Sequence, residues 1–161
     1  MTLPPAPERP GAIGVREVAD ADRDAWRVLW DGYNRFYGRH GDTALPADVT
    51  RTTWARFLDP AEPVHALVAV LEGRVVGLAH YLFHRSTITV EPTCYLQDLF
   101  TAVPARGHGA GAALIEEVAR RASSAGATRL YWQTHETNAV ARRLYDRVAE
   151  RSGFLVYRRP C

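Results

Sequence analysis

Residues 103–122 read "VPARGHGAGAALIEEVARRA" and join a glycine-rich loop to the start of an amphipathic helix. The apolar run before them predicts a strand, which Pro104 would end. Free N–H groups at a helix start, together with Arg106, favour a bound phosphate or pyrophosphate. The alternative is a turn that only connects a strand to a helix. Close approach of the backbone to a ligand would depend on three glycines: Gly107, Gly109 and Gly111.

Two nucleotide-binding motifs match this loop poorly. A dinucleotide fingerprint fits loosely as Gly107-x-Gly109-x-x-Ala112, but the next predicted strand offers no acidic residue for a ribose. A P-loop requires Lys followed by Ser or Thr after its last glycine, where this chain has alanines. Neither motif therefore explains the loop.

Outward from the loop, hydrophobic periodicity predicts alternating strands and helices without an internal repeat, which indicates a mixed α/β fold. We expect residues 1–12 to form a flexible, proline-rich tail and residues 13–161 to form a single domain. The predicted strands span 13–18, 64–73, 74–85, 93–103, 128–135 and 153–159, and the predicted helices span 22–38, 47–59, about 110–124 and 138–152.

Composition narrows the classes of protein. The net charge of +2 gives no general argument for nucleic acid, and acidic neighbours interrupt the basic face of the last helix. No stretch of about 18 apolar residues predicts a membrane span, and the N-terminus lacks a signal-peptide pattern. Cys94 and Cys161 are the only cysteines, so we expect no disulfide framework and a cytoplasmic location.

The loop resembles the acetyl-CoA motif of the GNAT superfamily of N-acetyltransferases, Arg/Gln-x-x-Gly-x-Gly/Ala, through Arg106, Gly109 and Gly111. Upstream, "YLQDLF" is similar to the family's "YLEDLY" strand, and downstream Asn138 and Tyr145 match its Asn-x6-Tyr helix. The resemblance extends from residue 13 to the last predicted strand, because the element order is also that of the family. It implies a mostly antiparallel twisted sheet flanked by helices and splayed at the acetyl-CoA site.

The resemblance also assigns roles. It implies that Tyr145 donates a proton to the leaving thiolate, while its alternative role is that of a core residue of an amphipathic helix. It further implies the histone and polyamine acetyltransferase-like branch, and a homodimer. The acetyl-CoA contacts that it implies involve Leu99, Phe100, Thr101, Arg106, Gly107, His108, Gly109, Ala110, Gly111, Asn138 and Tyr145.

The general base is left open. Related polyamine acetyltransferases have a glutamate where this chain has Gln97, and an amide cannot accept a proton at neutral pH. Asp98 is either the base or a buried structural polar group, since strand alternation points it away from Gln97. Ordered water, or His135 and Glu136, are further candidates. His80 and His84 share a strand face but lack a third nearby ligand, so no metal is expected.

Acceptor contacts are expected from the aromatic helix and the splayed strand, namely from Trp30, Tyr33, Tyr37 and Gln97, although aromatic residues at helical spacing also suit a core. Asp31 and Asp42 could attract an ammonium group or be solvated. We therefore predict an enzyme that transfers acetyl from acetyl-CoA to a primary amine of a small molecule such as an amino acid or polyamine. The alternatives are a protein or peptide N-acetyltransferase and a non-catalytic CoA-binding regulatory module.

Overall fold

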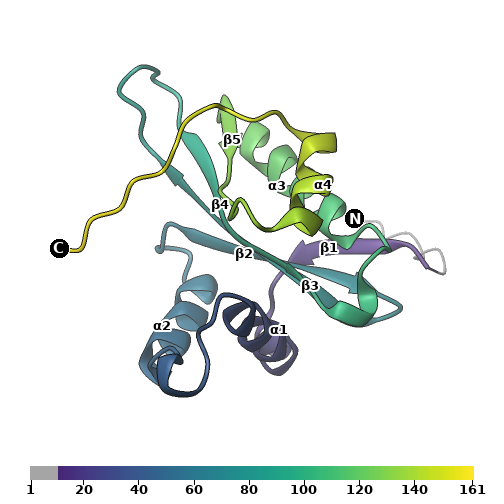
Figure 1. Ribbon diagram of the computed structural model, residues 1–161. Coiled ribbons are helices and arrows are strands. Elements are labelled where there is room, and N and C mark those ends of the chain that lie inside the picture. Colours follow the sequence, from purple (N-terminus) through teal and green to yellow (C-terminus); the bar gives the residue numbers. More distant parts are fainter. Residues whose placement is uncertain (1–10) are drawn as a thin grey trace.

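The computed structural model describes residues 11–161 and contains a single five-stranded sheet over that range, in the order β1-β2-β3-β4-β5 (Figure 1). Neighbouring strands are antiparallel except for β4 and β5, which are parallel. The predicted mixed, mostly antiparallel sheet is confirmed. The strands are β1 (Ile13–Glu17), β2 (Val64–Leu71), β3 (Arg74–His84), β4 (Thr93–Thr101) and β5 (Arg129–Tyr131).

Helices cover both faces of this sheet. In Figure 1, α1 and α2 lie on one side of the sheet, and α3 and α4 lie on the other. Each predicted helix is present, with ends shifted by a few residues, as expected where helices fray. The helices are α1 (Arg23–Phe36), α2 (Ala47–Leu58), α3 (Ala110–Ser124) and α4 (Ala139–Val148), with short 3-10 turns η1 (Asp20–Asp22), η2 (Gly41–Thr43) and η3 (Val103–Ala105).

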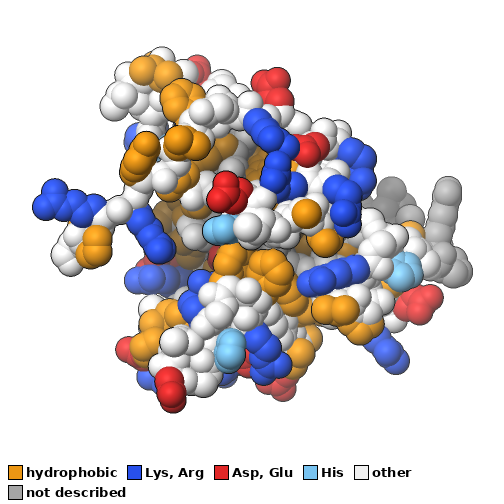
Figure 2. All heavy atoms as spheres, viewed as in Figure 1, with side chains coloured by type: hydrophobic (Ala, Val, Ile, Leu, Met, Phe, Trp, Pro, Cys, Tyr) orange, Lys and Arg blue, Asp and Glu red, His pale blue; other side chains and the backbone are white. Residues whose placement is uncertain are grey.

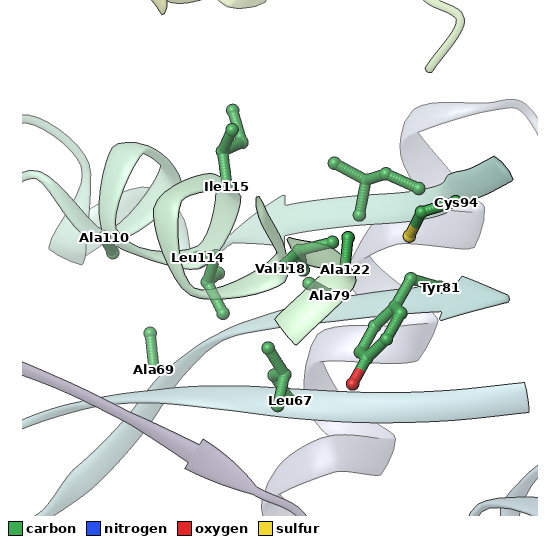
Figure 3. Close-up of a cluster of buried hydrophobic side chains, with 11 residues drawn as sticks. Leu67, Ala69, Ala79, Tyr81, Cys94, Ala110, Leu114, Ile115, Val118 and Ala122 are labelled. Atoms are coloured by element: carbon green, nitrogen blue, oxygen red, sulfur yellow. The ribbon is translucent and has the colours of Figure 1, made fainter. Parts of the chain in front are cut away.

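The apolar stripe of α3 forms the larger core with the sheet. Leu114 and Val118 are fully buried against residues of β2, β3 and β4, and Figure 3 shows their side chains pointing toward Leu67 and Ala79. Gly77 of β3 allows this close packing, because a Cβ there would lie 3.2 Å from Leu114 Cδ1. Residues spaced three and four apart in the sequence thus become one continuous buried face.

A second core lies under α1 and α2 and is largely aromatic. The rings of Trp26 and Trp30 stack at 5.8 Å, and those of Trp30 and Tyr33 at 5.4 Å, so α1 presents a continuous column of rings to the sheet. Trp54 of α2 closes this column from the side, 4.9 Å from Trp26. The aromatic face predicted for the first helix is therefore mainly a packing surface.

The sheet is irregular at one position in β4. His80 pairs with Asp98 and Tyr81 pairs with Leu96, so Gln97 is an extra residue without a partner on β3. On the other side of β4, pairing with β5 ends at Tyr95, and no described residue beyond it is paired with β5. The two strands separate from that point, which leaves one edge of β4 open.

The strand predicted at residues 153–159 does not form, and β5 is shorter than the predicted 128–135. Residues 149–161 have no regular secondary structure and extend from the body toward the C-terminus (Figure 1). The run of apolar and aromatic residues in this segment suits a strand, but a strand also needs a neighbour for its backbone hydrogen bonds. Within the described part of the chain, this segment pairs with no other strand.

The N-terminal tail predicted at residues 1–12 lies outside the described residues except for its last two positions. None of the helices found between residues 11 and 161 combines the length and the apolar character needed to cross a bilayer. Cys94 is buried and Cys161 is exposed, and both are free thiols.

Leu114→Ala should lower the free energy of unfolding by about 2–5 kcal/mol, because it leaves a cavity between α3 and the sheet. Urea denaturation of the two proteins measures this difference. Val28→Ala, at a position that is 72% exposed on α1, is the matched control and should change stability by less than about 0.5 kcal/mol. Equal losses in the two variants would contradict the packing described for α3.

Candidate functional site

The glycine-rich loop turns the chain from β4 into α3. After η3, both Gly107 (φ +82°) and Gly109 (φ +85°) adopt left-handed backbone conformations that other residues disfavour. Gly109 is also the N-cap of α3, and the first N–H that bonds back to the loop belongs to Ala113, which donates to the Gly109 carbonyl. The N–H groups of the first helical turn are therefore left for a ligand, beside the positive end of the helix.

A groove of about 420 Å³ opens beside this helix start, between β4, α1, the loop and α4. Apolar side chains from α1 and α4 form its walls, and the loop contributes backbone and Arg106 at one end. The described residues that line it are Tyr33, Phe36, Tyr37, Leu99, Phe100, Thr101, Ala105, Arg106, Gly107, Gly109, Ala110, Gly111, Ala112, Asn138, Val140, Ala141, Leu144, Tyr145 and Arg147.

The structure brings most of the predicted acetyl-CoA residues to this groove. Arg106 lies over the Phe100 ring and donates from Nε to the Thr101 carbonyl at 3.3 Å. Asn138 caps α4, with its side-chain oxygen accepting from the Ala141 N–H at 3.3 Å. His108 is the exception, because its Nδ1 lies 3.2 Å from two carbonyl oxygens of the loop itself.

Two of the residues predicted to contact acetyl-CoA, Phe100 and Gly111, have packing roles that the prediction did not include. A Cβ on Gly77 would lie 3.1 Å from the Phe100 carbonyl oxygen, so the Phe100 backbone faces β3 and only its side chain reaches the groove. Backbone groups of alternate residues face opposite sides of a strand, so those of Leu99 and Thr101 face the open edge. A Cβ on Gly111 would lie 3.0 Å from Leu144, so this glycine also allows α3 and α4 to pack closely.

A second, smaller cavity of about 20 Å³, room for about one water, adjoins the groove. The two cavities share Tyr33, Tyr37, Leu99 and Tyr145, and these side chains mark the point where they meet. The described residues that line the smaller cavity are Tyr33, Tyr37, Leu96, Gln97, Leu99, Trp132, Gln133 and Tyr145. The sequence analysis missed Trp132 and Gln133, although their place just after a short parallel strand is a usual position for ligand contacts.

Tyr145 projects from α4 to this meeting point. Its ring packs edge-on against Trp132 at 5.4 Å, which fixes the direction of the phenol. Burial, and to a lesser extent the neighbouring Tyr37, raises the pKa of Tyr145 to about 12. The hydroxyl therefore keeps its proton throughout the neutral range.

A chain of buried polar groups runs beneath the smaller cavity. The Trp26 indole Nε1–H donates to His80 Nε2 at 3.0 Å, and His80 Nδ1 lies 2.9 Å from Asp98 Oδ2. An indole N–H can only donate, so His80 Nε2 must accept and the ring proton must be on Nδ1, where it is donated to Asp98. The sequence analysis considered His80 only as a metal ligand and did not detect this chain, whose first two members are 54 residues apart.

Asp98 in turn faces the tyrosines of α1, which strand alternation alone did not reveal. Burial, followed by the charge and hydrogen bonding of Asp98, raises the pKa of Tyr33. Burial and the same carboxylate also raise the pKa of Tyr37, which Arg39 opposes. The Asp98 side chain is only 11% exposed, and it acts on the smaller cavity through Tyr33, which lines that cavity.

Other candidate residues lie away from the meeting point of the two cavities. Trp30 was expected to contact the acceptor, but it is 7% exposed, lies in the aromatic core and donates to Thr50 Oγ1 at 3.3 Å. Its placement favours a structural role.

The polar candidates lie at the surface. His135 is exposed and bonded to Thr137 Oγ1 at 2.7 Å. Asp31 is paired with an arginine one helical turn away. Asp42 and Glu136 are both exposed. No cluster of three or more metal-ligating side chains occurs among residues 11–161.

Comparison with known proteins places this geometry in a family. The pattern of the "Acetyltransferase (GNAT) family" matches residues 23–149. D-amino-acid N-acetyltransferase HPA3 of Saccharomyces cerevisiae is 36% identical over 149 residues, which cover 91% of this chain and 90% of the yeast protein. A protein of Bacillus subtilis, uncharacterized N-acetyltransferase YhfO, is 28% identical over 90% of this chain and 95% of its own length.

Solved structures share the fold at lower identity. A ribosomal-protein-alanine N-acetyltransferase from Brucella melitensis superposes with a TM-score of 0.72 at 20% identity, covering 93% of this chain and all of that one. AAC(6')-Iy in complex with a CoA-linked bisubstrate analogue superposes with a TM-score of 0.77 at 18% identity, covering 93% and 99% of the two chains. The loop, the groove and these similarities agree: the chain belongs to the GNAT family and is an acetyl-transferring enzyme.

Proposed function

We propose that the protein transfers acetyl from acetyl-CoA to the primary amine of a small molecule. The observation that carries this proposal is the meeting of a long groove and a small cavity at Tyr33, Tyr37, Leu99 and Tyr145. A long cosubstrate in the groove and an acceptor whose amino group lies at the mouth of the cavity would bring their reacting atoms together there. The name of the yeast relative, a D-amino-acid N-acetyltransferase, supports an amino acid as the acceptor.

The groove fits the chemistry of CoA. Its polar end holds the free N–H groups of the α3 N-terminus and Arg106, which suit a pyrophosphate, while its apolar walls suit the rest of a long thioester. The CoA complex of AAC(6')-Iy, which has the same fold, supports this assignment. When bound, acetyl-CoA would supply a thioester carbonyl that an amine can attack directly.

The acceptor must lose a proton to become a nucleophile, and Asp98 is the best placed group to receive it. Its Oδ2 accepts from His80 Nδ1, and the same carboxylate acts on Tyr33, which lines the cavity. Since His80 contributes a hydrogen bond from a neutral ring, it orients Asp98 without adding a positive charge. Gln97 lines the cavity as an amide and would hold the acceptor by hydrogen bonds.

Tyr145 would act on the leaving group. The pKa of Tyr145 is raised to about 12, so the phenol keeps its proton at neutral pH. Its O–H is therefore available to stabilise negative charge as it develops on the thioester sulfur. The thiolate then takes a proton from Tyr145 or from solvent relayed through it. The groove and the smaller cavity both include this side chain, as the role requires.

Two alternatives predict other outcomes. A protein or peptide acetyltransferase needs an open groove for the acceptor, whereas the acceptor side here narrows to a cavity of about 20 Å³ that admits no more than a small group such as an amine. A non-catalytic CoA sensor is suggested by Gln97, but Asp98 and Tyr145 offer the acid–base groups that such a sensor would not need. The small cavity favours a small acceptor. The two free cysteines support a reducing, cytoplasmic location.

We also propose that two copies of the chain associate through residues 153–159. Phe154, Leu155, Val156 and Tyr157 are 87%, 79%, 65% and 89% exposed, and in Figure 2 the C-terminal segment stands away from the body. Four consecutive exposed apolar residues are costly in water. A second copy, related by a two-fold axis, would cover both segments at once and supply the missing strand partner.

A panel of acceptors tests the function. With acetyl-CoA present, thiol release should occur with one class of small amines, such as amino acids, and not with basic peptides. Arg106→Ala should weaken CoA binding by calorimetry about 10-fold, because it removes a charge-assisted contact. Release with peptides alone would favour the protein acetyltransferase. CoA binding without release for any acceptor would favour the sensor.

The acid and base have separate signatures. Asp98→Asn should lower kcat/KM about 100-fold or more, the usual size of general-base catalysis, while CoA affinity stays within about twofold. Tyr145→Phe should lower kcat by about 10- to 100-fold with a similarly small change in CoA affinity. Asp42→Asn, at an exposed position on η2, is the matched control. Full turnover in either site variant, with an unchanged melting temperature, would remove that residue from the reaction.

Light scattering after gel filtration tests the dimer. The wild-type protein should elute at about twice the 17.9 kDa of one chain, as for a two-fold dimer. The double variant Leu155→Asp, Tyr157→Asp should elute as a monomer, because it places charges in the apolar contact. The control is Ile88→Asp, Val90→Asp, at positions that are 86% and 89% exposed in the β3–β4 loop. A monomeric wild-type protein would refute the association.

A further inference from the structure

Arg39 packs on two tyrosines that line the smaller cavity, in an orientation set by the end of α1. Gly38 (φ +74°) reverses the chain after the helix, and the Arg39 N–H bonds the Asn34 carbonyl at 2.9 Å. The guanidinium then lies over the rings of Tyr33 and Tyr37, with its central carbon 5.6 Å and 5.3 Å from their centroids. Both tyrosines line the groove and the smaller cavity.

A buried amide holds this guanidinium in place. Asn34 is 5% exposed, and its Nδ2 donates to the Trp30 carbonyl at 2.8 Å, so its Oδ1 must face outward. That oxygen accepts from Arg39 Nε at 2.6 Å. Between residues 11 and 161, neither Nη1 nor Nη2 of Arg39 has a hydrogen-bond acceptor within the chain. A planar pair of donors is thus oriented by stacking and by one hydrogen bond, and this pair matches a carboxylate.

The same tyrosines are also influenced by a group of opposite charge, Asp98. Asp98 and Arg39 both act on the Tyr33 and Tyr37 phenols, the first raising and the second lowering their pKa. The other arginines near the site lie at the groove and do not stack on these tyrosines in the contacts given above. Arg106 bonds the Thr101 carbonyl at the loop, and Arg147 lines the groove from α4. Tyr33 and Tyr37, which line both cavities, are therefore each contacted by an oriented cation and influenced by an anion.

We propose that Arg39 binds the carboxylate of an amino-acid acceptor whose amino group lies at Asp98. This inference rests on the proposed function and makes Arg39 a specificity-determining residue of the same site. A zwitterion satisfies both charges at once, whereas a polyamine or an aminoglycoside brings only positive charge toward Arg39. Like charges across a binding surface are disfavoured, so the site selects against those amines.

The test compares phenylalanine with its carboxamide, in both enantiomers, for the wild-type protein, Arg39→Met and Arg39→Lys. Methionine keeps much of the length of the side chain and removes the charge and the fork of donors. For the preferred enantiomer, Arg39→Met should raise KM for the amino acid about 10- to 100-fold and change KM for the amide less than about threefold. Arg39→Lys should recover part of the loss, because it restores the charge without the paired donors.

Arg27→Met is the matched control, since Arg27 lies on the exposed side of α1 and pairs with Asp31. It should leave both KM values unchanged. An equal loss for acid and amide in Arg39→Met would overturn the inference, as would an unaltered KM for the amino acid, while turnover of either acceptor would leave the acetyltransferase function standing.

A wrong assignment of the acetyltransferase function would be recognised by a different set of results. If no amine is acetylated by the wild-type protein, calorimetric titration of phenylalanine into the CoA-bound protein decides the role of Arg39 alone. Binding that weakens about 10-fold or more in Arg39→Met, but not in Arg27→Met, supports the carboxylate contact. Absence of binding to the wild-type protein, or equal binding to both variants, refutes it.

Discussion

The separation of β4 from β5 after the pair of Tyr95 and Tyr131 is the constraint on which the site depends. Up to that pair the two strands satisfy each other's backbone groups, and beyond it one edge of β4 is open. The opening exposes the backbone of Leu99 and Thr101, and it leaves room for the start of α3 and for α4 to form a groove. Gly111 completes the arrangement, because its missing side chain lets Leu144 of α4 pack against α3.

The aromatic core under the sheet connects packing to chemistry. Trp26 is 1% exposed and would leave an unpaired N–H there without His80, while the Nδ1 of His80 would lack a partner without Asp98. Each group satisfies the next, which is the condition for keeping polar atoms inside an apolar core. The last member is a carboxylate that acts on Tyr33, a side chain in the wall of both cavities. The same contacts that make the core complete therefore also orient the group best placed to accept a proton.

Much of this protein could be predicted from local patterns. The order of helices and strands up to residue 148 was predicted from periodicity, and the resemblance of three short motifs implied the GNAT family and an acetyl-transferring activity; the structure and the comparisons confirm these. The strand expected at residues 153–159 was wrong, because a run of apolar residues reports which side chains suit a strand and not whether a partner is present. Trp30 was expected at the acceptor, but helical spacing cannot distinguish a core face from a pocket wall.

The sequence by itself determined where helices begin, which faces are apolar and where glycine permits a left-handed turn, since these depend on residues a few positions apart. Tertiary structure alone decided that Trp26 meets His80, that Asp98 faces Tyr33 and that Asn34 orients Arg39 beside the same cavity. The extra residue at Gln97 changes which side chains of β4 lie together, and it is defined only by pairing with β3. Contacts between distant segments depend on strand register and helix packing, which no local pattern encodes.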